Sequence, residues 1–387
     1  MRSSSFVSST TSKMDSASTS TSSLFSLDKS TYSALWQNRA NYYYHHEEID
    51  ESDHGVTTCG VEELDRTTSH SPLTFEFGTR LHREAKFVFV LVGLPAVGKS
   101  STSEHLVEFF KGQPATKNLR CSIYNAGKVR RSMSFQNLGL LSMQLANNSS
   151  EDLFSPKNYN KKEMYAKITL EKLLNDLDSD VCDVAIFDAT NSRVNRRRFV
   201  FDEICSYNQK RNTRFCITPI VLQISCTDHD FIKFNVHNKS FNADYFDKPY
   251  EYAVRDFAKR MRNYHSQFTP FTDEEFRQVS KLVKAHGLDY GVFFFNIVNA
   301  GMIPTGEQNL GVLPVQRGRV QTVVGLVGQF VEHYTKMFGH SYVERVVEFF
   351  NNEAAGGSQY MSVLNDVINQ EFLEELQGSL ECNVKAN

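Results

Sequence analysis

The chain has 387 residues, and its 42 Lys and Arg nearly balance 45 Asp and Glu, which leaves a formal charge of −3. Its content of 40% hydrophobic and 12% aromatic residues is that of a globular protein, long enough for about one to three domains. The balanced charge excludes a chain-wide attraction to nucleic acid or to an anionic membrane, and no apolar run reaches the ~20 residues that span a bilayer.

The first residues carry no targeting signal that we can identify. They lack the apolar block of a secretory signal and are too poor in Arg for a mitochondrial transit peptide. The 7 cysteines form an odd set without a CxxC pair, so we expect reduced thiols. These features predict a cytoplasmic protein without a nucleic-acid or membrane partner.

Residues 1–80 are expected to form a Ser/Thr-rich, largely disordered region, because more than half of the first thirty residues are Ser or Thr. Such a tract buries too little apolar surface to offset its ordering entropy. The simplest interpretation is a solvated tail. The alternative is a regulatory arm whose hydroxyl groups are phosphorylated by a regulatory protein kinase.

The ordered core should begin near Lys86, where a continuous apolar run is typical of a strand buried on both faces. Strand patterns then alternate with helical patterns, which predicts an α/β fold with a doubly wound, mostly parallel sheet flanked by helices. The expected strands are Phe87–Val92, Ser122–Tyr124, Val184–Phe187, Ile217–Ile224 and Val292–Ile297. The expected helices are Ser101–Phe110, Glu163–Leu177 with an apolar stripe of Met164, Ile168, Leu174 and Leu177, and Tyr252–Phe268. Residues 301–387 should form a mostly helical C-terminal extension, with helices at Tyr342–Phe350 and Tyr360–Leu376.

Residues 93–100 read GLPAVGKS and satisfy the phosphate-loop pattern GxxxxGK[ST] in full. A buried strand before the pattern and a helix after it provide the context that a P-loop requires. In such a loop, backbone N–H groups and the helix N-terminus bind phosphate oxygens. Lys99 can then reach the β- and γ-phosphates, and the Ser100 hydroxyl can ligate Mg²⁺. The expected nucleotide-binding residues are Gly93, Leu94, Pro95, Ala96, Val97, Gly98, Lys99, Ser100 and Ser101.

The expected strand at 184–187 is followed by Asp188, at the position where P-loop proteins hold or orient Mg²⁺. A GTPase is excluded because Asp188 is followed by Ala-Thr-Asn without the glycine of DxxG. In addition, residues 238–241 read NKSF, so that Phe241 replaces the carboxylate that binds guanine. Residues 81–300 are therefore predicted to be a P-loop kinase domain of P-loop NTPase type that phosphorylates a small molecule.

Basic residues cluster after the expected strands. In a doubly wound sheet these segments meet the phosphate loop at one edge, and arginines there can hold a phosphate by paired hydrogen bonds. Each cluster alone is typical of a solvated helix face, but their shared placement favours an anionic acceptor. The clusters are Lys128, Arg130 and Arg131, then Arg193, Arg196, Arg197 and Arg198, and finally Lys239, Lys259, Arg260 and Arg262.

Several stretches resemble the kinase portion of the 6-phosphofructo-2-kinase/fructose-2,6-bisphosphatase family, and most of all its short fungal, kinase-only members. They are GLPAVGKS (93–100), YNAGKVRR (124–131), AIFDATNSRVNRR (185–197), the region 226–245 with Lys239 and Asp244-Tyr245, and DFAKRMRNY (256–264). The AIFDATN and DFAKRMRNY segments are far more specific than the P-loop alone.

The resemblance implies ATP-dependent phosphorylation of the 2-hydroxyl of fructose 6-phosphate, with Mg²⁺ at Ser100 and Asp188. The product would be fructose 2,6-bisphosphate, a regulator of glycolysis. Lys99 would hold ATP, Lys239 matches the family lysine between the transferring phosphoryl group and the sugar, and Asp188 could accept the hydroxyl proton. Two lysines and Mg²⁺ would then stabilise the charge on the moving phosphoryl group. The matching sugar-phosphate contacts are Arg130 with the adjacent Arg131, Thr190, Arg196, Arg260 and Tyr264.

This chain also departs from the family pattern. Where the family has a further arginine at the sugar phosphate, it has Lys162 beside Lys161, and a point charge without the guanidinium fork predicts weaker substrate affinity. The Arg-His-Gly motif of a bisphosphatase is missing, so no bisphosphatase domain is expected in 301–387. Two rival functions stay open: a P-loop kinase for another phosphosugar or nucleotide, and a non-catalytic regulatory protein that binds ATP. A homodimer is also left open.

Overall fold

The structure is a computed structural model of the chain, and it describes residues 84–136, 159–210, 214–285, 291–303, 318–351 and 358–385. The disordered region predicted at residues 1–80 lies outside these ranges.

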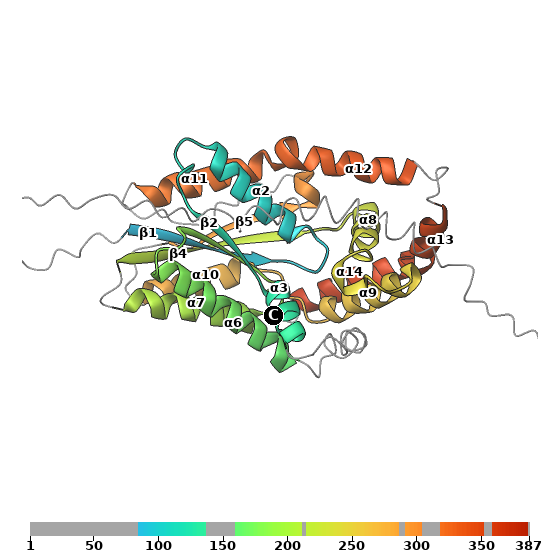
Figure 1. Cartoon of the computed structure of the whole chain (residues 1–387), viewed down its shortest axis with the longest axis horizontal. Coiled ribbons are helices and arrows are strands. Elements are labelled where there is room, and N and C mark those ends of the chain that lie inside the picture. The colour runs from blue at the N-terminus through green and yellow to red at the C-terminus, as the bar shows by residue number, and fades with distance from the viewer. Residues whose placement is uncertain are drawn as a thin grey trace, which may run out of the picture. The chain divides into compact units, whose positions relative to one another are not determined.

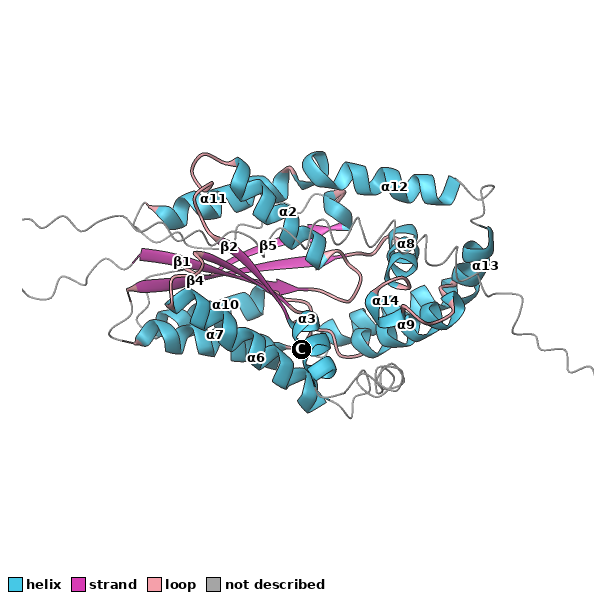
Figure 2. Ribbon diagram, in the orientation of Figure 1, coloured by secondary structure: helices cyan, strands magenta, loops and turns pink. Residues whose placement is uncertain are grey.

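A five-stranded sheet forms the centre of the described residues, with the strand order β2-β3-β1-β4-β5 and every neighbouring pair parallel (Figure 2). The predicted parallel α/β sheet is therefore confirmed, and every expected strand is present with ends that differ by at most three residues. The strands are β1 (Glu84–Val92), β2 (Cys121–Asn125), β3 (Val184–Asp188), β4 (Phe215–Ser225) and β5 (Phe293–Val298).

The helices connect and cover these strands. Within the described ranges, every helix falls short of the length and apolar character that a membrane-spanning segment needs. The helices are α2 (Lys99–Gly112), α3 (Ala126–Gln136), α6 (Tyr159–Asp178), α7 (Val194–Gln209), α8 (His229–Lys239), α9 (Tyr250–His265), α10 (Asp273–Ala285), α11 (Arg319–Glu332), α12 (His340–Asn351), α13 (Ser358–Val367) and α14 (Gln370–Lys385).

The side chains of β1 alternate between two cores, one on each face of the sheet. Phe87, Phe89 and Leu91 pack in a cluster with residues of α2 and α11, whereas Val88 and Val90 pack with residues of α6 and α7. Figure 1 shows α2 and α11 on one side of the sheet and α6, α7 and α10 on the other. The continuous apolar run in the sequence is thus explained by burial on both faces.

The C-terminal helices join the helices that follow β4. Leu364 and Ile368 of α13 and Phe372 of α14 lie in one buried cluster with Phe257 and Met261 of α9. Figure 1 shows α13 and α14 beside α8 and α9. The segment beyond residue 303 therefore contributes to the same packed structure as the segment before it.

The apolar stripe expected in α6 was only partly right, because Leu177 is fully buried and Leu174 packs against the core, whereas Met164 does not. Met164 is 43% exposed, and the residues that face the sheet are Ala166, Leu170, Leu173 and Leu177, all at most 1% exposed. These residues recur at spacings of three and four, so the helical period was right but its phase was assigned from the wrong apolar residue.

The helix expected over Tyr360–Leu376 is divided in two. Asn369 accepts a hydrogen bond from the backbone N–H of Phe372 at 2.9 Å, which is the geometry of an N-cap. α14 therefore begins as a new helix after α13 ends at Val367.

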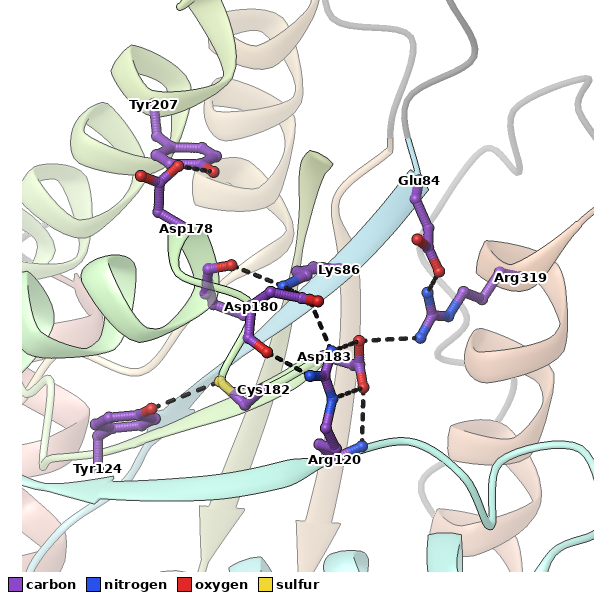
Figure 3. Close-up of polar contacts among 11 residues, drawn as sticks. Glu84, Lys86, Arg120, Tyr124, Asp178, Asp180, Cys182, Asp183, Tyr207 and Arg319 are labelled. Atoms are coloured by element: carbon purple, nitrogen blue, oxygen red, sulfur yellow. Dashed lines mark hydrogen bonds and ion pairs between the residues drawn. The ribbon is translucent and has the colours of Figure 1, made fainter. Parts of the chain in front are cut away.

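An ion-pair network joins the amino ends of β1, β2 and β3 to the start of α11 (Figure 3). The fully buried Lys86 donates from Nζ to Asp180 at 2.8 Å. Arg120 reaches Asp180 at 2.7 Å and Asp183 at 2.9 Å, and Arg319 reaches Asp183 at 3.4 Å. The amino ends of these three strands, which lie opposite the phosphate loop, are thus connected by linked ion pairs.

Candidate active site

The phosphate-loop sequence forms a tight turn between β1 and α2. Gly93 passes so close to β4 that a Cβ atom there would lie 2.4 Å from the carbonyl oxygen of Ile224, which only glycine avoids. Ala96 and Gly98 have φ values of 62° and 97°, in the left-handed region. A turn of this kind directly before a helix N-terminus provides a cradle for phosphate oxygens.

The start of α2 brings the loop to the end of β3. Ser100 Oγ donates to Asp188 Oδ2 at 2.7 Å, and Lys99 Nζ donates to the carbonyl of Leu94 at 2.5 Å. Burial lowers the pKa of Lys99 to about 8, against the opposing effect of Asp188, and the charge of Lys239 lowers it further. The two predicted lysines and the predicted carboxylate therefore lie in one electrostatic environment.

β2 contributes Asn125, which the sequence analysis missed. Asn125 lies opposite Asp188 in the parallel register, and its Nδ2 donates to Asp188 Oδ2 at 2.5 Å. The Ser100 hydroxyl and the Asp188 carboxylate are the hard oxygen donors that Mg²⁺ prefers, so this pair fits a magnesium ion. An amide at the carboxyl end of the neighbouring strand was the available signal for Asn125.

The remaining loop residues lie around this point. The backbone N–H of Gly93 donates to the carbonyl of Thr190 at 3.1 Å, so the segment after Asp188 borders the loop. Leu94 is buried at 6% exposure, while residues 95–97 are half-buried. Ser101, one residue further along α2 than Ser100, is exposed.

Lys239 is the last residue of α8 and faces the same region. Its side chain touches solvent, but the surrounding protein still desolvates the ammonium group and lowers its pKa. Asp188 opposes this effect, Arg131 and Arg260 add to it, and Asp244 opposes it. Lys239 therefore lies within electrostatic range both of Lys99 and Asp188 and of the predicted acceptor residues Arg131 and Arg260.

Arg130 of α3 and Arg260 of α9 converge on Asp244 in the 3-10 turn η6 (Ala243–Tyr245). Arg130 Nη2 lies 2.8 and 3.0 Å from the two carboxylate oxygens. Arg260 Nη1 lies 3.5 Å from Asp244 and donates to the Tyr245 hydroxyl at 2.8 Å. Asp244 is part of a stretch that carried the family resemblance, but its two partners could not be read from the sequence.

Lys162, Arg196 and Tyr264 extend this cluster. Lys162 Nζ lies 5.0 Å from the centre of the Tyr264 ring, and Arg196 Nε donates to Glu163 at 2.5 Å. Burial lowers the pKa of Lys162 to about 8, and neighbouring guanidinium groups lower it further. Those groups are Arg260, Arg193, Arg130 and Arg196. Five of the residues predicted for the sugar phosphate are thus brought together: Arg130, Lys162, Arg196, Arg260 and Tyr264. Arg193, predicted only as part of a basic cluster, also lies here, and Glu163 is a neighbour that was not predicted.

The basic cluster after β3 was only partly right. Arg197 is fully buried and binds Glu275 at 2.7 and 2.5 Å, so it supports the structure between α7 and α10. Arg198 is exposed and pairs with Asp202 at 3.8 Å. The 3.6-residue helical period explains this, because consecutive residues of α7 point in different directions.

The sequence model of a family described as 6-phosphofructo-2-kinase matches residues 77–303. The chain is 32% identical over 202 residues to 6-phosphofructo-2-kinase 1 of Saccharomyces cerevisiae, a match that covers 51% of this chain and 22% of that protein. It is 29% identical over 247 residues to 6-phosphofructo-2-kinase/fructose-2,6-bisphosphatase of Caenorhabditis elegans, covering 62% of this chain and 47% of that protein. The chain therefore spans less than half the length of either relative.

A crystal structure of a fungal RNA kinase aligns with 71% of this chain and 99% of that chain, with a TM-score of 0.31 and 12% identity. A similarity this low bears on neither the fold nor the function.

Proposed function

Because the chain belongs to the 6-phosphofructo-2-kinase family, we propose that it transfers the γ-phosphoryl group of ATP to the 2-hydroxyl of fructose 6-phosphate. The product would be fructose 2,6-bisphosphate. The observation that carries this proposal is the meeting of three groups at the carboxyl edge of one sheet: the phosphate loop with Lys99, the lysine Lys239, and the cationic cluster around Arg130 and Arg260.

The catalytic contribution of the chain is electrostatic. In phosphoryl transfer, negative charge spreads over the moving group, and positioned cations stabilise that charge. Lys99 and Lys239 approach this point from α2 and α8, so they can bind the phosphoryl oxygens from two directions. Ser100 and Asp188 would hold Mg²⁺, which when bound supplies further positive charge to the phosphates. Asp188 can also accept the proton of the attacking hydroxyl.

The acceptor would lie on the opposite side of Lys239 from the phosphate loop. Arg130, Arg196 and Arg260 can bind the 6-phosphate by charge-assisted hydrogen bonds, aided by Lys162. Burial raises the pKa of Tyr264, with Arg260 the strongest opposing charge, so Tyr264 stays a neutral phenol that can donate a hydrogen bond. Thr190 borders the loop and completes the proposed set.

The direct test is to incubate the purified full chain with MgATP and fructose 6-phosphate and to look for an acid-labile product phosphorylated on the anomeric carbon. Turnover with AMP or another phosphosugar, but not with fructose 6-phosphate, would reject the proposal in favour of another small-molecule kinase. ATP binding without turnover of any acceptor would favour a non-catalytic regulatory protein.

Lys99→Ala is the matching variant. It removes one of the two lysines that face the phosphoryl group, so we expect kcat to fall by about 10³-fold or more while the fold is retained. Product formation would be measured by a coupled assay, and thermal unfolding would be compared with that of the unchanged chain. Unaltered turnover in this variant would contradict the role of Lys99.

The cellular setting is also a proposal. The odd set of 7 cysteines without a CxxC pair supports a cytoplasmic location. A homodimer is testable by size-exclusion chromatography with light scattering. The Ser/Thr content of the first thirty residues supports a protein kinase as a regulatory partner, and mass spectrometry of the isolated protein would test this.

A further inference from the structure

Asp244 is the carboxylate at the centre of the cationic cluster. Its two oxygens lie 2.8 and 3.0 Å from Nη2 of Arg130, and Oδ2 lies 3.5 Å from Nη1 of Arg260. The two arginines are separated from Asp244 by 114 and 16 residues in the sequence. A single carboxylate therefore links guanidinium groups that come from two different helices, α3 and α9.

The position of Asp244 is itself fixed. Its backbone N–H donates to Asn242 Oδ1 at 2.9 Å, which caps the turn. The next residue, Tyr245, is 1% exposed, and its hydroxyl donates to Asp256 at 2.5 Å while accepting from Arg260 at 2.8 Å. The carboxylate of Asp244 thus belongs to a turn whose position is fixed by hydrogen bonds and by the buried Tyr245 side chain.

The charges around Asp244 keep it ionised. Burial would raise the pKa of Asp244, but Arg130 and Arg260 outweigh this effect, with Arg131 adding to it, and hold the pKa below the usual range. The Asp244 side chain is 13% exposed, and those of Arg130 and Arg260 are 16% and 11% exposed. Because these three side chains are largely shielded from water, the attraction between Asp244 and the two arginines is strong. Removing the charge of Asp244 would leave the buried guanidinium groups without a counter-charge.

We propose that Asp244 is a positioning residue that holds Arg130 and Arg260 in place to receive the phosphate group of the acceptor. Its action is indirect, because it orders the two arginines before the substrate arrives and offsets part of their mutual repulsion. The inference rests on the proposed function for the identity of the acceptor, but not for the binding of phosphate to the arginine cluster.

A different role for Asp244, as an anion that competes with the substrate for the arginines, would change KM in the opposite direction. If Asp244 occupied the phosphate position as a competing anion, its neutralisation would strengthen substrate binding. If it ordered the arginines, its neutralisation would weaken binding, because each guanidinium would lose its fixed direction. The sign of the change in KM therefore separates the two roles.

The test is Asp244→Asn in the full chain, which keeps the size of the side chain and removes its charge. We expect KM for fructose 6-phosphate to rise by about 10- to 100-fold, as for other groups that orient ligand-binding side chains. The KM for ATP and kcat at saturating sugar should change by less than about 3-fold. A merely structural role would instead change all three constants together, and a fall in KM for the sugar would overturn the inference.

The matched control is Asp366→Asn. Asp366 also pairs with an arginine of α9, Arg255 at 2.7 Å, but this pair lies on the exposed face of the helix, with both side chains more than half exposed. The kinetic constants of the Asp366→Asn variant should equal those of the unchanged chain. Asp244→Glu keeps the charge and moves it, so it should give an intermediate KM, and it also serves if Asp244→Asn does not fold. A wild-type KM in Asp244→Glu together with a misfolded Asp244→Asn would count against the inference.

A second measurement does not depend on turnover. In the Lys99→Ala background, which weakens the phosphate loop, inorganic phosphate should raise the unfolding temperature through the arginine cluster. Adding Asp244→Asn should abolish this shift, and adding Asp366→Asn should not. If the chain fails to phosphorylate fructose 6-phosphate, the proposed function fails while this measurement still decides the role of Asp244. An undiminished phosphate shift in the Asp244→Asn variant would overturn it.

Discussion

Lys162 is the residue at which this chain departs from the family pattern, and its surroundings give it a second distinctive property. Its pKa is lowered to about 8 by burial and by Arg260, Arg193, Arg130 and Arg196. The lowered pKa favours the neutral amine of Lys162, so the positive charge is lost as pH rises through about 8. From a pKa near 8, about nine-tenths of the side chain is charged at pH 7 and about one-tenth at pH 9.

We therefore predict that fructose 6-phosphate binds more weakly as pH rises from 7 to 9. In Lys162→Arg the charge persists throughout this range, so binding should be tighter and its pH dependence flatter. Calorimetric titration without nucleotide measures this directly and avoids a contribution from Lys99. A variant with the same pH dependence as the unchanged chain would show that Lys162 does not face the phosphate.

At the residue scale, the sequence was informative where a motif had a demanding context. The GLPAVGKS pattern predicted the loop because a strand and a helix had to flank it. Asn125 escaped notice because its role depends on the pairing of β2 with β3. Arg197 was misassigned because a basic residue after a strand gives no sign that Glu275, 78 residues later, will bury it.

At the scale of elements, the Arg197–Glu275 pair joins α7 to α10. Arg197 is 0% exposed and also donates to the carbonyls of Asn191 and Thr269, at 2.9 and 2.8 Å. We predict that Glu275→Gln destabilises the protein by about 3–5 kcal/mol, because it leaves the buried guanidinium without its counter-charge. Urea unfolding would measure the loss.

The neighbouring pair Arg198–Asp202 provides the control, since both of its side chains are largely exposed. Asp202→Asn should change stability by less than about 0.5 kcal/mol. Equal losses from Glu275→Gln and Asp202→Asn would show that burial does not set the strength of the inner pair.

Among the elements, β1 and β3 were predictable because continuous apolar runs have few other uses in a globular chain. The strand order was not, since it depends on which helices cross which face. α11 was not identified either, because its Val-rich sequence with Gly325 and Gly328 suits neither helix propensity nor alternation. It is helical because Val323, Val327 and Phe330 pack against the sheet and α2.

At the scale of the whole molecule, the described residues after 303 are part of the core, although the family match ends there. Each buried Val, Leu or Phe contributes about 1.5–3 kcal/mol, and a domain is stable by only about 5–15 kcal/mol in total. We predict that a chain ending at Ile303 does not hold the native fold, as measured by circular dichroism and thermal unfolding. The buried residues lost include Val323, Val324, Val327, Phe330, Leu364, Ile368, Phe372 and Leu376.

A second truncation removes residues 1–75 from the other terminus. We expect its turnover to equal that of the full chain. A cooperative unfolding transition in the chain that ends at Ile303 would show that the C-terminal helices are an accessory to a self-sufficient domain.

The linked charges at Lys86, Arg120, Asp180 and Asp183 have a consequence for how this protein responds to a substitution (Figure 3). They connect β1, β2 and β3 at the amino ends of these strands, at the end of the sheet opposite the phosphate loop. An exchange at Lys162, at the carboxyl ends of the strands, leaves these four charges unchanged. We therefore expect Lys162→Arg to alter the binding of an anionic acceptor while this network continues to hold the amino ends of the strands together.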